Sequence, residues 1–164
     1  MAVMAKARSA TVDGIAQATP KRSYETSGPV DPTKFYPKFG PLPAVVEVRD
    51  QTGPWDAAGR TRKLVLSDGG HVIETITHAD SPNYFAYELT DFQKLFGRLV
   101  SSARAEWRFE RVAGGTRIRW TYTFHALPGR GWIVGMIVRL FWAPYMSRVI
   151  PTIVAEVERG ATSI

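Results

Sequence analysis

The clearest pattern in the chain is an alternation of apolar and polar residues between Val100 and Phe124. A period of two residues is typical of β-strands with one buried face. Gly114-Gly115 supplies the glycines that a tight turn between two strands needs. The pattern therefore predicts an antiparallel hairpin with one mainly aromatic inner face. The residues expected on that face are Ala103, Ala105, Trp107, Phe109, Ile118, Trp120, Tyr122 and Phe124.

Shorter apolar segments separated by turn residues predict the rest of the sheet. Strands are expected over residues 22–26, 45–50, 60–66, 72–77 and 84–90, and Asp68-Gly69-Gly70 predicts a second hairpin. Asp31-Pro32 predicts a helical turn, with Asp31 as its N-cap and Pro32 at the first helical position. Residues 92–98 are expected to form a connection with some helical character.

The apolar stretch from Trp132 to Val157 predicts a long helix that covers the aromatic face of the sheet. Pro144 and Pro151 each remove an intrahelical hydrogen bond, which predicts a kink or a break near one of them. Arg139 and Pro144 argue against a membrane span, because a span needs about twenty apolar residues without a central charge. Residues at three- and four-residue spacing are expected to face the sheet: Phe141, Tyr145, Val149 and Thr152.

Length and composition predict one globular domain. A chain of 164 residues is long enough to bury a core, and its 45% hydrophobic and 22% charged residues are ordinary values. Residues 1–20 lack periodicity and are rich in Ala, Ser and Thr, so we expect a disordered basic tail there and a single domain over residues 21–164. No apolar run in the tail resembles a signal peptide, and we expect a cytoplasmic protein. The absence of cysteine excludes disulfides and thiol chemistry.

The net charge of +6 raises the question of a nucleic acid or an anionic membrane as partner. Arginines on the outer face of the central hairpin would form a basic patch, although glutamates lie between them. The alternative is that the cations only solvate the outer faces of strands, because they alternate with apolar residues and do not cluster. The arginines of the candidate patch are Arg104, Arg108, Arg117 and Arg119.

Several short segments resemble functional motifs, but their sequence context does not support the corresponding sites. Gly129-x-Gly131-x-x-x-Gly135 resembles a dinucleotide loop, but it follows an antiparallel strand and has no βαβ unit around it. His71, His78 and His125 lack metal-ligand spacing, so no metal or cofactor is expected. No nucleophile elbow is present. The aromatic residues face inward, away from the cations, which disfavours base stacking and a specific nucleic-acid partner.

Arg62 and Glu74 are the two charged residues expected on the inner face of the sheet, because each shares the parity of apolar neighbours in its strand. A three-residue loop, Asp68-Gly69-Gly70, would pair Leu64 with Glu74 and leave Arg62 diagonal to Glu74. A two-residue loop would oppose Lys63 to Glu74. The first register is favoured because it buries two leucines. An inward charge pair is costly to desolvate, so the pair is either a polar anchor for a ligand or a structural ion pair.

Gly59-x-x-Arg62, Asp68-Gly69, Glu74, Phe85-x-Tyr87 and Gly115-Thr116-x-Ile118-x-Trp120 occur in this order before the long C-terminal helix. This arrangement resembles the polyketide cyclase/START-like superfamily, also called SRPBCC or Bet v 1-like. The resemblance implies an α+β helix-grip fold. In that fold a curved antiparallel sheet of six to seven strands wraps around the C-terminal helix, with an apolar cavity between them. The chain departs from the family at its front, where prolines shorten the usual first strand and helix pair.

Three functions remain open, because the fold does not choose among them. The favoured one is binding of a small, largely apolar molecule, lipid-like or polyketide-like, by a monomer or homodimer. The second is a cyclase/aromatase-type enzyme without a metal or covalent nucleophile, using Tyr122 as proton donor and Arg62 or Glu74 as orienting or basic group. The third is a basic module for a membrane surface or RNA. The expected ligand-binding residues are Arg62, Leu64, Glu74, Ile76, Phe85, Tyr87, Trp107, Trp120, Tyr122, Phe124, Phe141 and Tyr145.

Overall fold

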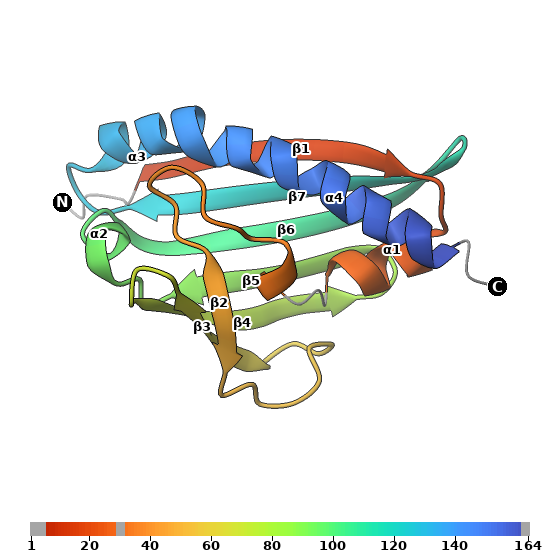
Figure 1. Ribbon diagram of the computed structural model, residues 1–164, viewed down its shortest axis with the longest axis horizontal. Coiled ribbons are helices and arrows are strands. Elements are labelled where there is room, and N and C mark those ends of the chain that lie inside the picture. Colours follow the sequence, from red (N-terminus) through yellow and green to blue (C-terminus); the bar gives the residue numbers. More distant parts are fainter. Residues whose placement is uncertain (1–5, 29–31, 162–164) are drawn as a thin grey trace.

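A computed structural model describes residues 6–28 and 32–161 and shows one curved antiparallel sheet with a long helix lying across its inner face (Figure 1). The sheet has seven strands in the order β1-β7-β6-β5-β4-β3-β2. The predicted helix-grip architecture is therefore confirmed. The elements are β1 (Lys6–Ala16), α1 (Pro20–Ser27), η1 (Pro32–Lys34), β2 (Val45–Arg49), β3 (Thr61–Leu66), β4 (His71–Asp80), β5 (Tyr84–Thr90), α2 (Lys94–Gly97), β6 (Val100–Val112), β7 (Gly115–Ala126), α3 (Gly131–Ile137), η2 (Val138–Trp142) and α4 (Ala143–Ala161).

The hairpin of β6 and β7 forms the centre of the core, as its alternation predicts. Each of the eight residues expected on its inner face is at most 5% exposed. Trp107 pairs with Trp120 across the two strands, and their rings stack with centroids 4.9 Å apart. Aromatic pairs of this kind add to the stabilisation that burial already provides.

The front of the chain differs from the prediction of a disordered tail. Residues 6–16 form β1, which pairs with β7 along its whole length. The inner side of β1 carries small residues because the helix lies close to it: a Cβ on Gly14 would meet the Cγ2 of Val154 at 3.0 Å. Residues 22–26, expected as a strand, lie in α1, where the Thr19 hydroxyl accepts a hydrogen bond from the Arg22 backbone N–H as an N-cap. The predicted cap residue Asp31 lies outside the described residues, whereas Pro32 begins η1 as expected.

One continuous helix runs through α3, η2 and α4, and its middle turn is π-helical. The N–H of Ala143 bonds to the carbonyl of Val138, five residues earlier. Pro144 follows at once and has no N–H to donate to Leu140, which accounts for an interruption of the normal ladder here. Of the two prolines near which a kink or break was predicted, Pro144 is therefore the one that adjoins it. Pro151 lies inside α4 without a break.

The sheet-facing stripe of the helix is only partly as predicted. Tyr145 and Val149 are buried, but Phe141 is half-buried beside Gly40, and Thr152 is exposed and bonds to the carbonyl of Arg148. The wider π-helical turn shifts the phase between Phe141 and the residues of α4. The fully buried residues of α4 are Met146, Ile153 and Val157.

Within the described residues, Gly131–Gly160 is long and apolar enough to cross a bilayer by length and composition alone. In the fold this helix covers the inner face of the sheet (Figure 1). A third of its most apolar window is buried against the protein, which leaves much apolar surface facing outward.

The β3–β4 hairpin uses neither of the two registers considered from the sequence. Arg62 lies directly opposite Glu74, and Leu64 lies opposite Val72. The loop is Ser67-Asp68-Gly69, closed by a 2.9 Å bond from the Leu66 N–H to the Gly70 carbonyl. The Asp68 carboxylate accepts the Gly70 N–H at 2.8 Å and stabilises the turn, so the loop is one residue earlier than expected.

Candidate functional site

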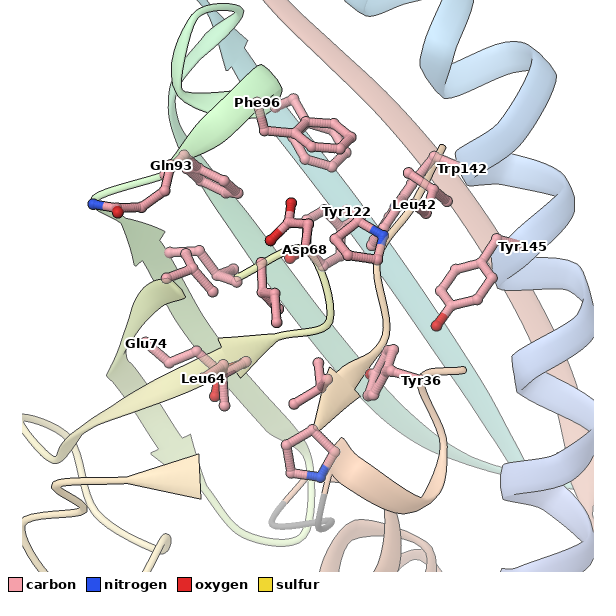
Figure 2. Close-up of a pocket in the computed structure, with 18 of the residues that line it drawn as sticks. Tyr36, Leu42, Leu64, Asp68, Glu74, Gln93, Phe96, Tyr122, Trp142 and Tyr145 are labelled. Atoms are coloured by element: carbon pink, nitrogen blue, oxygen red, sulfur yellow. The ribbon is translucent and has the colours of Figure 1, made fainter. Parts of the chain in front are cut away.

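A cavity opens between the inner face of the sheet, the helix and the loop that joins η1 to β2 (Figure 2). The cavity has a solvent-accessible volume of about 100 Å³. A single water molecule needs roughly 10–15 Å³ of such volume, so the cavity can hold more than a few waters. The lining residues are Pro32, Tyr36, Leu42, Pro43, Val45, Leu64, Leu66, Asp68, Val72, Glu74, Tyr87, Leu89, Phe92, Gln93, Phe96, Tyr122, Phe124, Trp142 and Tyr145.

Glu74 brings a carboxylate to this otherwise largely apolar lining. It is 3% exposed, and its Oε2 accepts a 2.6 Å hydrogen bond from Nε of Arg62, which is 5% exposed. The Arg62 guanidinium in turn lies 4.0 Å from the ring centroid of Trp55. Burial raises the pKa of Glu74, and the positive charge and hydrogen bond of Arg62 counteract this only in part.

Four tyrosines surround the cavity from three different elements: Tyr36 from the loop, Tyr87 and Tyr122 from the sheet, and Tyr145 from the helix. Burial raises the pKa of each of them above the ordinary tyrosine value. Hydrogen bonds with Trp107 and Tyr36 reach the Tyr87 hydroxyl and counteract this effect in part. At neutral pH all four phenols are protonated. The bond between Tyr36 and Tyr87 uses one of these protons, and the other three can be donated to a ligand.

Trp142 closes the cavity from the π-helical turn. Its ring packs against Tyr122 at 4.6 Å, Phe124 at 5.2 Å and Tyr145 at 5.4 Å between centroids. Its indole Nε1 is buried and has no hydrogen-bond partner among the residues that the structure describes. Because a buried donor without a partner is costly, this N–H is a further candidate for a ligand contact.

Of the twelve residues expected from the sequence to bind a ligand, six line the cavity: Leu64, Glu74, Tyr87, Tyr122, Phe124 and Tyr145. Arg62 is not part of the lining, but it donates a hydrogen bond to Glu74, which is. Trp107, Trp120, Ile76 and Phe85 fill the solid core instead, and Phe141 is half-buried outside the lining. The stacked tryptophans leave no space for a ligand between them.

The main residues missed from the sequence come from connections and from the helix turn. They share no period with the strands that they cover, so alternation does not reveal them. The aromatic residues of the proline-rich stretch 35–43 were the one available signal, since apolar side chains in a loop must pack against something. The missed residues include Tyr36, Leu42, Phe92, Phe96 and Trp142.

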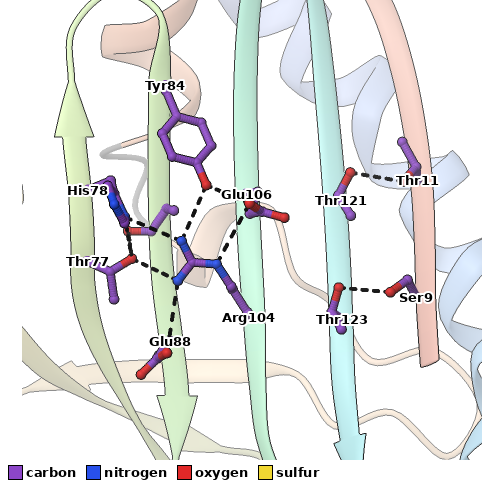
Figure 3. A network of polar contacts seen from close by, with 11 residues as sticks. Ser9, Thr11, Thr77, His78, Tyr84, Glu88, Arg104, Glu106, Thr121 and Thr123 are labelled. Carbon is purple, nitrogen blue, oxygen red and sulfur yellow. Dashed lines mark hydrogen bonds and ion pairs between the residues drawn. The ribbon is translucent and has the colours of Figure 1, made fainter. Parts of the chain in front are cut away.

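The outer face of the sheet carries the arginines that suggested a basic patch, and Figure 3 shows the acidic and polar groups around one of them, Arg104. Arg104 lies within 4.0 Å of both Glu88 and Glu106, and it donates hydrogen bonds to Thr77 and Tyr84. Arg117 pairs with Glu110, Arg119 pairs with Asp13, and Arg108 lies over the ring of Tyr84. This pairing neutralises much of the expected patch. Among the described residues, no group of three or more His, Cys, Asp and Glu could hold a metal ion.

Comparison with known proteins adds a family and a set of similar folds. The sequence profile of the family described as polyketide cyclase / dehydrase and lipid transport matches residues 10–158. No curated protein matches the chain in sequence. The Zhui aromatase/cyclase from a Streptomyces species is similar in structure, with a TM-score of 0.69 and 11% identity over 96% of this chain and 98% of that chain.

Two further solved structures have the same fold. Ara h 8.0201 has a TM-score of 0.60 and 16% identity over 93% of this chain and 98% of that chain. XoxI from Bacillus cereus has a TM-score of 0.63 and 12% identity over 92% of this chain and 95% of that chain. At such low identities the likeness shows the fold and carries no function with it.

Proposed function

Because the chain belongs to the polyketide cyclase/dehydrase and lipid transport family, we propose that it binds one small, largely apolar molecule in the cavity between sheet and helix. The composition of the lining carries this proposal. Mostly apolar side chains enclose a buried carboxylate and four tyrosine hydroxyls. Sites that bind apolar molecules and orient them through a few polar groups have this composition.

The charges around the cavity favour a neutral ligand with one polar end. Glu74 is already paired with Arg62, so the buried charges balance, and an ionic ligand would add an uncompensated charge. The protonated tyrosines can donate to a carbonyl or hydroxyl oxygen, and the carboxylate of Glu74 can accept from a hydroxyl. We expect the polar end of the ligand to lie near Glu74 and its apolar body to lie toward Phe96 and Trp142.

Two matched substitutions on β4 test whether the cavity is the binding site. Val72 and Ile76 are both buried on the inner face of this strand, but only Val72 lines the cavity. Val72→Phe is expected to fill free space, keep the stability of the wild type, and reduce binding of an uncharged polarity-sensitive dye such as Nile red at least tenfold.

Ile76→Phe serves as the control. It enlarges a side chain in a filled core and is expected to lose about 1–3 kcal/mol of stability while dye affinity remains. Dye affinity that Val72→Phe leaves unchanged would contradict the proposal.

A cyclase-type reaction is the second candidate, and one observation favours it. Tyr122, a protonated phenol, and Glu74, a carboxyl group with a raised pKa, both line the same cavity. A carboxyl group whose pKa is shifted toward neutrality is suited to general acid–base catalysis. Turnover of an aromatic polyketide-like ketone that Tyr122→Phe abolishes, with binding retained, would support this role. Failure of the wild type to turn over any ketone of a panel would exclude it.

A further inference from the structure

The first half of the long helix exposes a stripe of large apolar side chains to solvent. Trp132 is 65% exposed, Met136 47% and Leu140 50%. They are spaced four residues apart and therefore lie on one side of the helix. Trp132 is far more exposed than Trp55, Trp107 or Trp120, which are all buried. Such a row of large apolar side chains on a surface marks an interaction site.

The charge around the stripe is positive. Residues 127–155 contain three arginines and no aspartate or glutamate. Arg139 follows Met136 by three residues and is exposed on the same side of the helix. Arg130 is exposed at the start of the helix, two residues before Trp132. Arg8 from β1 approaches the same helix and donates to the carbonyl of Gly131 at 3.0 Å.

The last residue of the stripe lies in the helical turn that also contributes to the cavity lining. Leu140 and Trp142 both belong to η2, with Leu140 exposed on the outer side and Trp142 lining the cavity on the inner side. In α2, Leu95 is 55% exposed and precedes Phe96, which also lines the cavity. The two elements that contribute Trp142 and Phe96 to the lining, η2 and α2, therefore each carry an exposed leucine as well. Figure 1 shows α2 and α3 at the same end of the sheet.

We propose that Trp132, Met136 and Leu140, flanked by Arg130 and Arg139, dock the protein on the surface of an anionic lipid bilayer. Apolar side chains that enter the interface and cations that meet anionic headgroups are the two parts of such binding. A second copy of the chain fits this face less well, because a two-fold contact would bring the arginines of both copies together. The inference goes beyond ligand binding, since docking does not require the cavity to be occupied.

Co-sedimentation with two kinds of vesicle tests the docking. One contains equal parts of phosphatidylcholine and phosphatidylglycerol, and the other contains phosphatidylcholine alone. The wild type is expected to bind the anionic vesicles, and added salt weakens this binding. Trp132→Ser is expected to reduce binding about tenfold, because burial of so large an apolar side chain is lost. Arg139→Gln is expected to reduce it about fivefold on the anionic vesicles only.

Two control variants, at the end of the sheet away from Trp132, match the apolar and the cationic substitution. Ile15→Ser removes an apolar residue that is 52% exposed, and Arg111→Gln removes an exposed cation beside the β6–β7 turn. Both are expected to bind vesicles like the wild type. Val72→Phe is also expected to bind them normally, which separates docking from the function of the cavity. Met136→Ser keeps Trp132 as a fluorescence reporter of weaker insertion.

Three outcomes would overturn the proposal: no vesicle binding by the wild type, equal binding by Trp132→Ser and Ile15→Ser, or binding that is the same on both kinds of vesicle. Sedimentation velocity without lipid tests the alternative that a second copy of the chain binds to this face. A dimer that dissociates in Trp132→Ser would show that a second copy covers this face.

Discussion

Replacing Arg62 with methionine would leave the carboxylate of Glu74 alone in the interior. The two side chains are 5% and 3% exposed and share a 2.6 Å hydrogen bond. Removing one partner of a buried ion pair costs about 3–5 kcal/mol. Loss of the contact between the guanidinium and Trp55 adds about 1 kcal/mol, although the methionine retains part of the packing.

The cost of this substitution depends on pH in a defined direction. Burial already raises the pKa of Glu74 in the wild type, and Arg62 is what lowers it. Without Arg62 the pKa rises further, so the folded protein holds its proton more tightly than the unfolded chain does. The variant therefore loses little near the unfolded pKa of about 4.3. The loss of unfolding free energy in the variant grows as pH rises toward the pKa of Glu74 in the folded protein, and it stays constant above that pKa.

Urea unfolding of wild type and Arg62→Met between about pH 5 and pH 8 measures this dependence. Lys63→Met is the matched control on the same strand, since its 3.7 Å pair with Asp50 is partly exposed and is worth at most about 1 kcal/mol. The double variant Arg62→Met/Glu74→Leu should recover most of the loss and its pH dependence. An equal loss for Arg62→Met at every pH, or a double variant less stable than Arg62→Met, would refute the reasoning.

Three further predictions concern the core, the first strand and the tyrosines. Trp107→Ala and Trp120→Ala should each lose about 3–5 kcal/mol in urea unfolding, whereas Trp132→Ala should change stability by less than about 0.5 kcal/mol; equal effects would contradict the solid stacked core. Deletion of residues 1–17 removes β1 and should abolish cooperative thermal unfolding, and an unchanged transition would show that β1 is dispensable. Burial raises the pKa of all six tyrosines, so stability should fall above about pH 10, where the unfolded chain loses its phenolic protons first. Ultraviolet titration should show the four tyrosines of the cavity ionising only together with unfolding; ionisation of all six tyrosines in the folded protein near pH 10 would contradict it.

Alternation was sufficient to predict the centre of the fold and its buried charges. The β6–β7 hairpin has large aromatic residues on one parity and charged residues on the other, so the two faces were distinct. The same argument placed Arg62 and Glu74 on the inner face, where both are buried. Alternation did not determine the register between β3 and β4. The Asp68 side chain stabilises a loop that begins one residue earlier than the glycines at positions 69 and 70 suggested.

The segments that could not be predicted lack a strong contrast in polarity between their inner and outer positions. In β1 the inner positions are small because the helix lies against them, so Ala10, Val12 and Gly14 alternate with Ser9, Thr11 and Asp13 without a clear apolar signal. The hydroxyl pairs Ser9–Thr123 and Thr11–Thr121 join this strand to β7, and a single sequence does not show such pairing in advance (Figure 3). Cavity residues such as Tyr36 belong to a loop without period, and the π-helical turn that orients Trp142 changes the phase of the helix.

Native mass spectrometry of the protein purified from its own host tests the proposed binding most directly. The wild type is expected to carry a small apolar molecule that leaves on denaturation, and Val72→Phe, which fills the cavity, is expected to show the bare mass of the chain. A bare wild-type mass, together with dye binding that Val72→Phe leaves intact, would contradict the account.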